Sequence, residues 1–229
     1  MAEDAELIAL IAVAQDPQTP QDERLKLADH PRAAVRAAVA GNPEGPASVL
    51  KRLAEDSDKR VRTAVAENPL TPSAVVDELA FDEDWAVRAG AAANPAISDF
   101  TLSEMTRDDD VRVREAAAAN HGLGAKDFNR CRDDDDWRVR AAAASNPGAP
   151  EDSLSQLAQD RDWQVRARVA GNELAALVLL RTLATDEDWR VRAAVASNPS
   201  SESEVLAALI ADSERTVREL AIRHHTSSA

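Results

Sequence analysis

The chain has 229 residues, a formal net charge of −14 and an isoelectric point near 4.7. Nucleic acids and anionic membranes are bound by surfaces rich in Lys and Arg, so this charge argues against both as partners. The only cysteine, Cys131, excludes an internal disulfide and a multi-cysteine metal or iron–sulfur site. We therefore expect no cofactor and no bound metal.

The first predicted element is a helix over residues 3–15, followed by two prolines at the spacing seen in later units. Its apolar run, Leu7–Ala14, is too short to span a bilayer and follows acidic residues. The run is not typical of a signal peptide, which favours a cytoplasmic location. We interpret residues 1–33 as a degenerate N-terminal capping repeat.

A Val-Arg pair then recurs every 26 residues without slippage, at Val35-Arg36, Val61-Arg62, Val87-Arg88, Val113-Arg114, Val139-Arg140, Val165-Arg166, Val191-Arg192 and Val217-Arg218. A strict period in this range is typical of a solenoid. We therefore expect one repeat domain over 1–229, with stacked repeats at 34–223 and a frayed tail at 224–229.

Each unit contains two predicted helices of about ten residues. In the first, Leu50 and Leu53 lie on one helical face, and in the second Val61 and Val65 do so. An acidic segment supplies the N-cap of the second helix, and an Asn-Pro pair ends it. Helices this short are stabilised by stacking against neighbours. The fold class is all-α, and no strand alternation is present.

The stretch Val191–Pro199, Val-Arg-Ala-Ala-Val-Ala-Ser-Asn-Pro, together with a following Leu-x-x-Leu-Ala-x-Asp, resembles the leucine-rich repeat variant family. The resemblance covers about Pro17 to Arg223 and implies a right-handed solenoid of alternating α- and short 3₁₀-helices, with no settled activity. From Arg62 on, each repeat arginine is preceded by an Asp six residues earlier, and in this the repeats resemble the broader HEAT family. One branch of the first family carries a cysteine-ligated iron–sulfur module, which is not carried over because no cysteine precedes Cys131.

Stacking turns each repeat position into a row of side chains. Aspartates at 58, 84, 110, 136, 162 and 188 precede the repeat arginines by four residues, the spacing of a helix-stabilising ion pair. We interpret them as caps and an ion-pair ladder; calcium or catalytic carboxylates are the alternative. Asparagines at 42, 68, 94, 120, 146, 172 and 198 are predicted to satisfy backbone groups at the helix ends.

Two further rows are candidates for partner binding. Trp85, Trp137, Trp163 and Trp189 precede the repeat arginine by three residues, a spacing that allows stacking; they are either packing residues or exposed anchors. Arg60, Arg112, Arg138 and Arg190 precede the repeat valine over small residues. That basic stripe suits an acidic peptide, unless each arginine is solvated and paired with the Asp four residues earlier.

One unit lacks the turn proline and carries Leu177, Val178 and Leu179 where other units are mostly polar or small. These side chains form an exposed patch for a partner or for a second copy of this chain through 174–180. The alternative is that the helix starts early and turns them into the core.

We expect a protein-binding or scaffolding solenoid without catalytic activity. Two alternatives remain: a HEAT-like enzyme acting on nucleic-acid bases in a basic cleft, and an acidic nucleic-acid mimic with a continuous acidic face.

Overall fold

The computed structural model describes residues 2–227, and every regular element in that range is an α-helix. The chain divides into two compact units, one ending at Gly122 and the other beginning at Leu123. The expected all-α solenoid of short helix pairs is confirmed. Within residues 2–227 no helix is long and apolar enough to cross a membrane.

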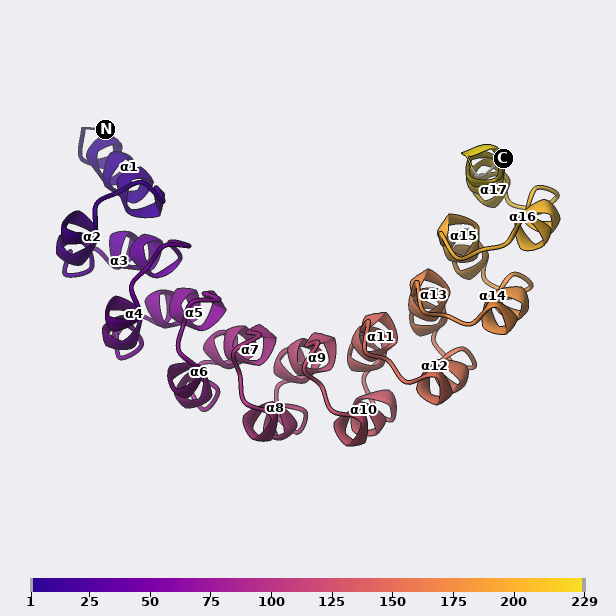
Figure 1. The fold of residues 1–229 in the computed structure, drawn as a ribbon, viewed down its shortest axis with the longest axis horizontal. Coiled ribbons are helices and arrows are strands. Elements are labelled where there is room, and N and C mark those ends of the chain that lie inside the picture. Colours follow the sequence, from indigo (N-terminus) through magenta and orange to yellow (C-terminus); the bar gives the residue numbers. More distant parts are fainter. Residues whose placement is uncertain (1, 228–229) are drawn as a thin grey trace. The chain divides into compact units, whose positions relative to one another are not determined.

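The odd-numbered helices form one layer of each unit and the even-numbered helices the other (Figure 1). In the first unit the odd helices are α1 (Ala2–Gln15), α3 (Ala33–Ala40), α5 (Lys59–Glu67), α7 (Trp85–Ala93) and α9 (Val111–Ala119). The even helices are α2 (Gln21–Leu27), α4 (Ala47–Leu53), α6 (Ser73–Leu79) and α8 (Asp99–Met105).

The second unit repeats this arrangement. Its even helices are α10 (Ala125–Arg132), α12 (Glu151–Leu157), α14 (Leu177–Leu183) and α16 (Ser203–Leu209). Its odd helices are α11 (Trp137–Ser145), α13 (Trp163–Gly171), α15 (Trp189–Ser197) and α17 (Arg215–Ser227).

The short helices are α-helical, not 3₁₀ as the family resemblance implies. In α6, for example, the backbone N–H of Ala80 donates to the carbonyl of Val76, four residues earlier. Thr71 does not cap this helix, as its sequence position suggests, because its hydroxyl donates to the carbonyl of Val65 at 2.6 Å. Pro72 is the N-cap instead, with extended backbone angles and no side-chain bond.

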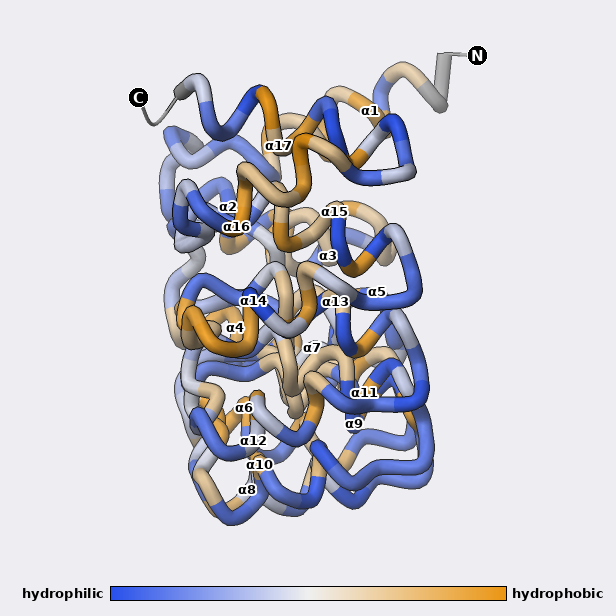
Figure 2. The backbone as a smooth tube through the Cα atoms, turned by 90° about the vertical axis from the view of Figure 1, so that its right-hand side faces the viewer, coloured by the Kyte–Doolittle hydropathy of each residue, from blue (hydrophilic) through white to orange (hydrophobic). Residues whose placement is uncertain are grey.

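Alanine explains how closely the odd helices approach one another. Each odd helix packs against the next odd helix of its unit. The alanine two residues before each buried asparagine is completely buried there: Ala40, Ala66, Ala92, Ala118, Ala144, Ala170 and Ala196. Leu and Val from the even helices fill the space between the layers, and hydrophilic residues mark the outer loops (Figure 2).

The buried asparagines join consecutive repeats. Asn68 donates from its side-chain amide to the carbonyls of Ala40 and Asn42 in the preceding repeat, at 2.7 and 3.0 Å. Its side-chain oxygen accepts the N–H of Leu70, which closes the following turn. The predicted backbone role of this row is therefore confirmed, and it reaches across the repeat boundary.

The last helix extends into the predicted tail. In the last repeat His224 and His225 replace Asn-Pro, and no proline ends the helix. Helix α17 continues to Ser227, and His224 Nδ1 lies 3.1 Å from the carbonyl of Ala196, where an asparagine amide lies in other repeats. Residues 228–229 of the predicted tail lie outside the described residues.

The lone thiol is structural, as expected. Cys131 lies in α10, in the row of core leucines, and is 1% exposed.

Candidate functional site

The repeat arginines bind the next repeat, not their own helix. Arg62 donates from Nε and Nη2 to the two carboxylate oxygens of Asp82, at 2.6 and 2.9 Å, and from Nη1 to the carbonyl of Asp56 at 2.9 Å. Arg36, Arg88, Arg140, Arg166 and Arg192 make the same set of bonds. Arg140 and Arg166 are buried, with Arg140 only 5% exposed, and the other arginines of this set are half-buried.

The pairing predicted four residues apart, between Asp58 and Arg62, is wrong. The Asp58 carboxylate turns to its own helix end, where it accepts the N–H of Arg60 at 2.9 Å. Arg62 is thereby left to the aspartate of the next repeat. The paired carboxylates are held ionised: the hydrogen bond from Arg36 holds the pKa of Asp56 below its ordinary value, and Arg192 does the same for Asp212.

The second arginine row is paired with aspartates two residues earlier, not four. Arg60 reaches Asp58 at 2.6 Å and Arg112 reaches Asp110 at 2.6 Å; Arg138 and Arg190 bind Asp136 and Asp188 in the same way. The bond from Arg112 lowers the pKa of Asp110 to about 2. This predicted basic stripe is therefore neutralised along its length by the cap aspartates.

Three residues of the tryptophan row, Trp85, Trp163 and Trp189, stack with arginines of that second row and not with the repeat arginine three residues on. The Arg112 guanidinium lies over Trp85, 3.3 Å from the ring centroid. The Arg190 guanidinium lies 4.6 Å from the Trp163 ring and 5.1 Å from the Trp189 ring. Trp85 and Trp137 are 37% and 39% exposed, so each keeps solvent-accessible ring surface.

Helix α13 breaks this pattern at its first turn. Gln164 stands where neighbouring repeats have Arg138 and Arg190. The Asp162 carboxylate binds Arg140 at 2.6 Å, and α13 has no side-chain N-cap bond. No guanidinium in the described chain stacks on Trp137, because position 164 is a glutamine.

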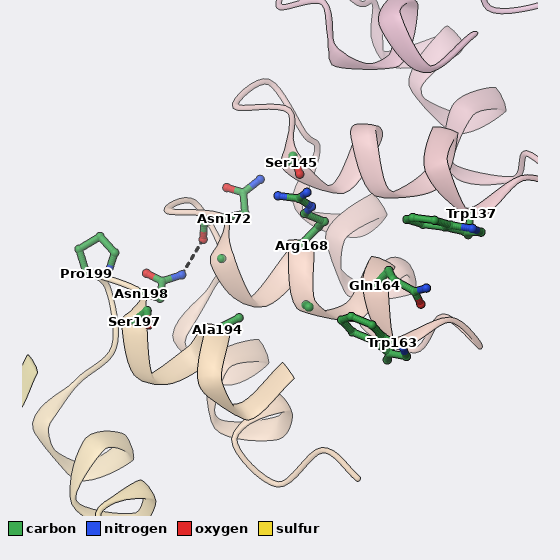
Figure 3. A pocket seen from close by; sticks show the side chains of 12 residues that line it. Trp137, Ser145, Trp163, Gln164, Arg168, Asn172, Ala194, Ser197, Asn198 and Pro199 are labelled. Carbon is green, nitrogen blue, oxygen red and sulfur yellow. Dashed lines mark hydrogen bonds between the residues drawn. The ribbon is translucent and has the colours of Figure 1, made fainter. Parts of the chain in front are cut away.

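A groove of about 640 Å³ opens at this break, across the odd-helix face of the second unit. Trp137 and Ser145 of α11 form one side, Ala194 and Ser197 of α15 the other, and α13 lies between them. Figure 3 shows Gln164 between Trp137 and Trp163, and Arg168 extending toward Ser145. The floor is made of small residues, including Gly171. A Cβ atom added at Gly171 would have no other atom within 4 Å.

Three polar side chains of the groove have no hydrogen bond or ion pair to any described residue: Gln164, Arg168 and Ser197. Ser145 and the two asparagines of the lining are occupied. Ser145 donates to the carbonyl of Ala141 at 3.0 Å, and the groove asparagines bind backbone groups. The groove therefore combines free donors, aromatic surface and one unpaired cation.

Sequence reasoning missed Arg168. Its repeat position holds Ala64, Gly90, Ala116, Ala142 and Ala194 elsewhere. The signal was a departure from the repeat pattern at two positions four residues apart, 164 and 168, which lie on one helical face. Neither departure matches a known motif, and only the two together indicate a site on this helical face.

The predicted apolar segment of α14 is split by the structure. The helix begins at Leu177, in register with Glu151 of α12, so the early start proposed from the missing proline is wrong. Val178 is 66% exposed and Leu177 half-buried. Leu179 lies in the row of the buried Val49, Val75 and Val205, and the longer side chain is half-buried there.

Residues 2–227 contain no group of three or more His, Cys, Asp or Glu side chains that could hold a metal ion.

Comparison with known proteins identifies the repeat. The family model described as leucine rich repeat variant matches residues 33–58, 137–162 and 189–214. These units are leucine-rich repeat variants. The family predicted from the sequence is thereby confirmed, and the matched units are spread over both halves of the chain.

Solved structures agree with this assignment. The chain is 27% identical to a leucine-rich repeat variant described as having a novel repetitive structural motif, with 93% of this chain and 84% of that chain covered and a TM-score of 0.59. The Escherichia coli protein YibA is 15% identical, with 96% of each chain covered and a TM-score of 0.54, and shares the fold alone. No curated protein matches the chain.

Proposed function

We propose that this leucine-rich repeat variant chain is a protein-binding module without catalytic activity, and that the groove across α11, α13 and α15 receives an extended segment of a partner protein. The observation that carries the proposal is the cluster of unpaired polar groups beside an uncovered tryptophan in that groove. In the neighbouring helices of this row the cap aspartates are bound by cations: Asp58, Asp110, Asp136 and Asp188 by the arginine two residues later, and Asp84 by Lys59.

The groove has the dimensions and chemistry of a binding site for a chain. Ligand sites are concave, largely apolar, and contain a few polar groups that orient what is bound. Small floor residues such as Ala167 and Gly171 allow a peptide backbone to approach closely. Tryptophan and arginine are the residues that contribute most to the stability of protein interfaces.

The two alternative functions have less support. A base-modifying enzyme needs free carboxylates near the tryptophans, whereas Asp110 and Asp188 are bound by arginines. A nucleic-acid mimic needs an acidic face, whereas the only ionisable side chain lining this groove is Arg168.

A random dodecapeptide display library, selected on the immobilised chain, tests the proposal. Gly171→Leu fills the groove without a clash at Cβ and should abolish binding of the selected peptides. Ala93→Leu is the matched control, because it changes the same repeat position of α7 in the other unit. Circular dichroism should show both variants folded. Selection of no peptide, or equal binding by the Gly171→Leu variant, would refute the proposed function.

A further inference from the structure

We propose that the groove of the second unit recognises an acidic side chain of an extended peptide, with Arg168 binding its carboxylate and Trp137 contacting an apolar side chain two residues away on the peptide. This inference rests on the proposed function and names the chemistry of the segment that the groove accepts.

The charge of the groove selects the acidic side chain. Arg168 is exposed, is the only ionisable residue of the lining, and has no acidic partner among residues 2–227. The nearest cap carboxylate, Asp162, is bound to Arg140 at 2.6 Å and is therefore not available to Arg168. A free guanidinium beside apolar surface binds a carboxylate through two parallel N–H···O bonds, which are stronger than bonds between neutral groups.

The position of Arg168 on α13 sets the spacing within the peptide. Gln164, which lies next to Trp137, precedes Arg168 by four residues, or about 6 Å along the helix axis. An extended chain advances about 3.3 Å per residue and directs alternate side chains to the same face. Two peptide residues with one residue between them therefore span about the same distance as the tryptophan and arginine subsites.

The peptide backbone also has partners in the groove. Gln164 offers both a donor and an acceptor, and the Ser197 hydroxyl does the same from α15. Both are free within the described chain, and the floor between them is made of Ala167, Gly171 and Ala194. An extended segment lying along α13 can thus hydrogen-bond at its edges while its side chains reach the two subsites.

A single guanidinium favours a carboxylate over a phosphorylated side chain. Proteins that recognise phosphopeptides use clusters of arginine. Here the neighbouring arginines, Arg138 and Arg190, are already bound to Asp136 and Asp188. One free cation matches the charge of one carboxylate.

The experiment measures fluorescence anisotropy of a labelled, acetylated and amidated heptapeptide, Gly-Ser-Leu-Ser-Glu-Ser-Gly, with the purified full chain. Replacing its Glu by Gln should weaken binding about tenfold or more, the size expected for a charge-assisted bond. Placing Leu and Glu side by side should also weaken binding, because their side chains then point to opposite faces. Equal binding of the Glu and Gln peptides, or absence of binding by both, would overturn the inference.

The protein variants assign the effect to the proposed residue. Arg168→Ala introduces the residue that most repeats already have, so we expect it to fold, and it should remove the difference between the Glu and Gln peptides. Arg107→Ala removes an equal charge from an exposed pair in the other unit and should preserve the difference. A difference that persists in Arg168→Ala, or a phosphoserine peptide that binds tighter than the Glu peptide, contradicts the inference.

The library selection distinguishes failure of carboxylate recognition from failure of the proposed peptide-binding function. Selected peptides that lack Asp and Glu but are lost in Gly171→Leu would retain the peptide-binding function and refute carboxylate recognition.

Discussion

At the scale of the residue, one arginine in each repeat joins two helices of its own repeat to a loop of the next. Its guanidinium makes bonds to a carboxylate of the next repeat and to backbone carbonyls of its own. Burying such a charge is costly without partners, and the full set of bonds offsets that cost. The side chain therefore stabilises the stack mainly by fixing how consecutive repeats align.

We expect Arg140→Ala to lower the free energy of unfolding by about 3 kcal/mol, because it leaves the Asp160 carboxylate buried without its main partner. Thermal unfolding followed by circular dichroism measures the change. Arg138→Ala is the control: its side chain is 45% exposed, and loss of its ion pair should cost less than about 1 kcal/mol. Equal melting temperatures for wild type and Arg140→Ala would contradict the structural role.

The buried asparagine is the second residue that joins repeats. Asn94→Ala removes two bonds to the carbonyls of Ala66 and Asn68 and should destabilise the chain by about 2 kcal/mol. Asn94→Asp should destabilise it further at neutral pH, since a carboxylate would face two carbonyl oxygens. Urea unfolding gives both values, with the exposed Asn129→Ala as a control that should be nearly neutral. A stable Asn94→Asp variant would show that this amide is not needed.

At the scale of the element, α13 lacks the side-chain N-cap bond that α5, α7, α9, α11 and α15 have. Gln164→Arg should restore it, because an arginine there can bind Asp162 and return that carboxylate to the helix end. The expected gain is about 1 kcal/mol, the usual value of a side-chain N-cap. The new guanidinium would also cover Trp137, so affinity for groove peptides should fall. Higher melting temperature with unchanged peptide affinity would separate the cap from the groove and contradict the second expectation.

Helix α14 supports a different experiment on its apolar residues. Leu179→Asp places a charge in a row that is buried in α4, α6 and α16, so it should lower the melting temperature strongly. Val178→Asp changes a side chain that is 66% exposed and should leave stability nearly unchanged. Sedimentation equilibrium of the Val178→Asp variant tests the predicted association through 174–180. If both variants melt like wild type, Leu179 does not belong to the core.

At the scale of the whole molecule, the repeated Asp–Arg pairs make stability depend on pH. The hydrogen bonds from Arg36 and Arg192 lower the pKa of Asp56 and Asp212 in the folded chain. In the unfolded chain the pKa of these carboxyls is about 3.9. Because the folded pKa is the lower one, the contribution to stability is complete above about pH 4 and is lost as the pH falls through the folded pKa.

We therefore expect the melting temperature to fall between about pH 4 and pH 2, beyond any effect of the changing net charge. Thermal melts of wild type and Asp212→Asn at several pH values provide the measurement. The variant should melt lower than wild type at pH 7 and show a shallower fall in acid, because one titrating pair is absent. A melting temperature that rises from pH 4 to pH 2 would contradict the proposed linkage.

The strict period and the residues at each helix end determined where the helices lie. Asn-Pro ends one helix of each repeat, and an acidic segment begins the other. The 26-residue spacing of the apolar positions predicts that these helices stack as a solenoid. These are local rules of backbone conformation and helix periodicity, which is why they can be read from the chain. The role of the asparagines also followed, since an amide repeated at one position needs a repeated partner.

The tertiary structure decided which partner each charge takes. Asp58 and Arg62 are four residues apart, and local spacing favours their pairing, yet Arg62 binds Asp82, twenty residues on. Stacking of the repeats brings that carboxylate to the guanidinium, while the Asp58 carboxylate accepts the N–H of Arg60 at the start of its own helix. The groove arises in the same way: Gln164 and Arg168 look like isolated substitutions until three neighbouring helices place them beside Trp137. Contacts between repeats depend on how helices pack across the stack, and no window of the sequence contains both partners.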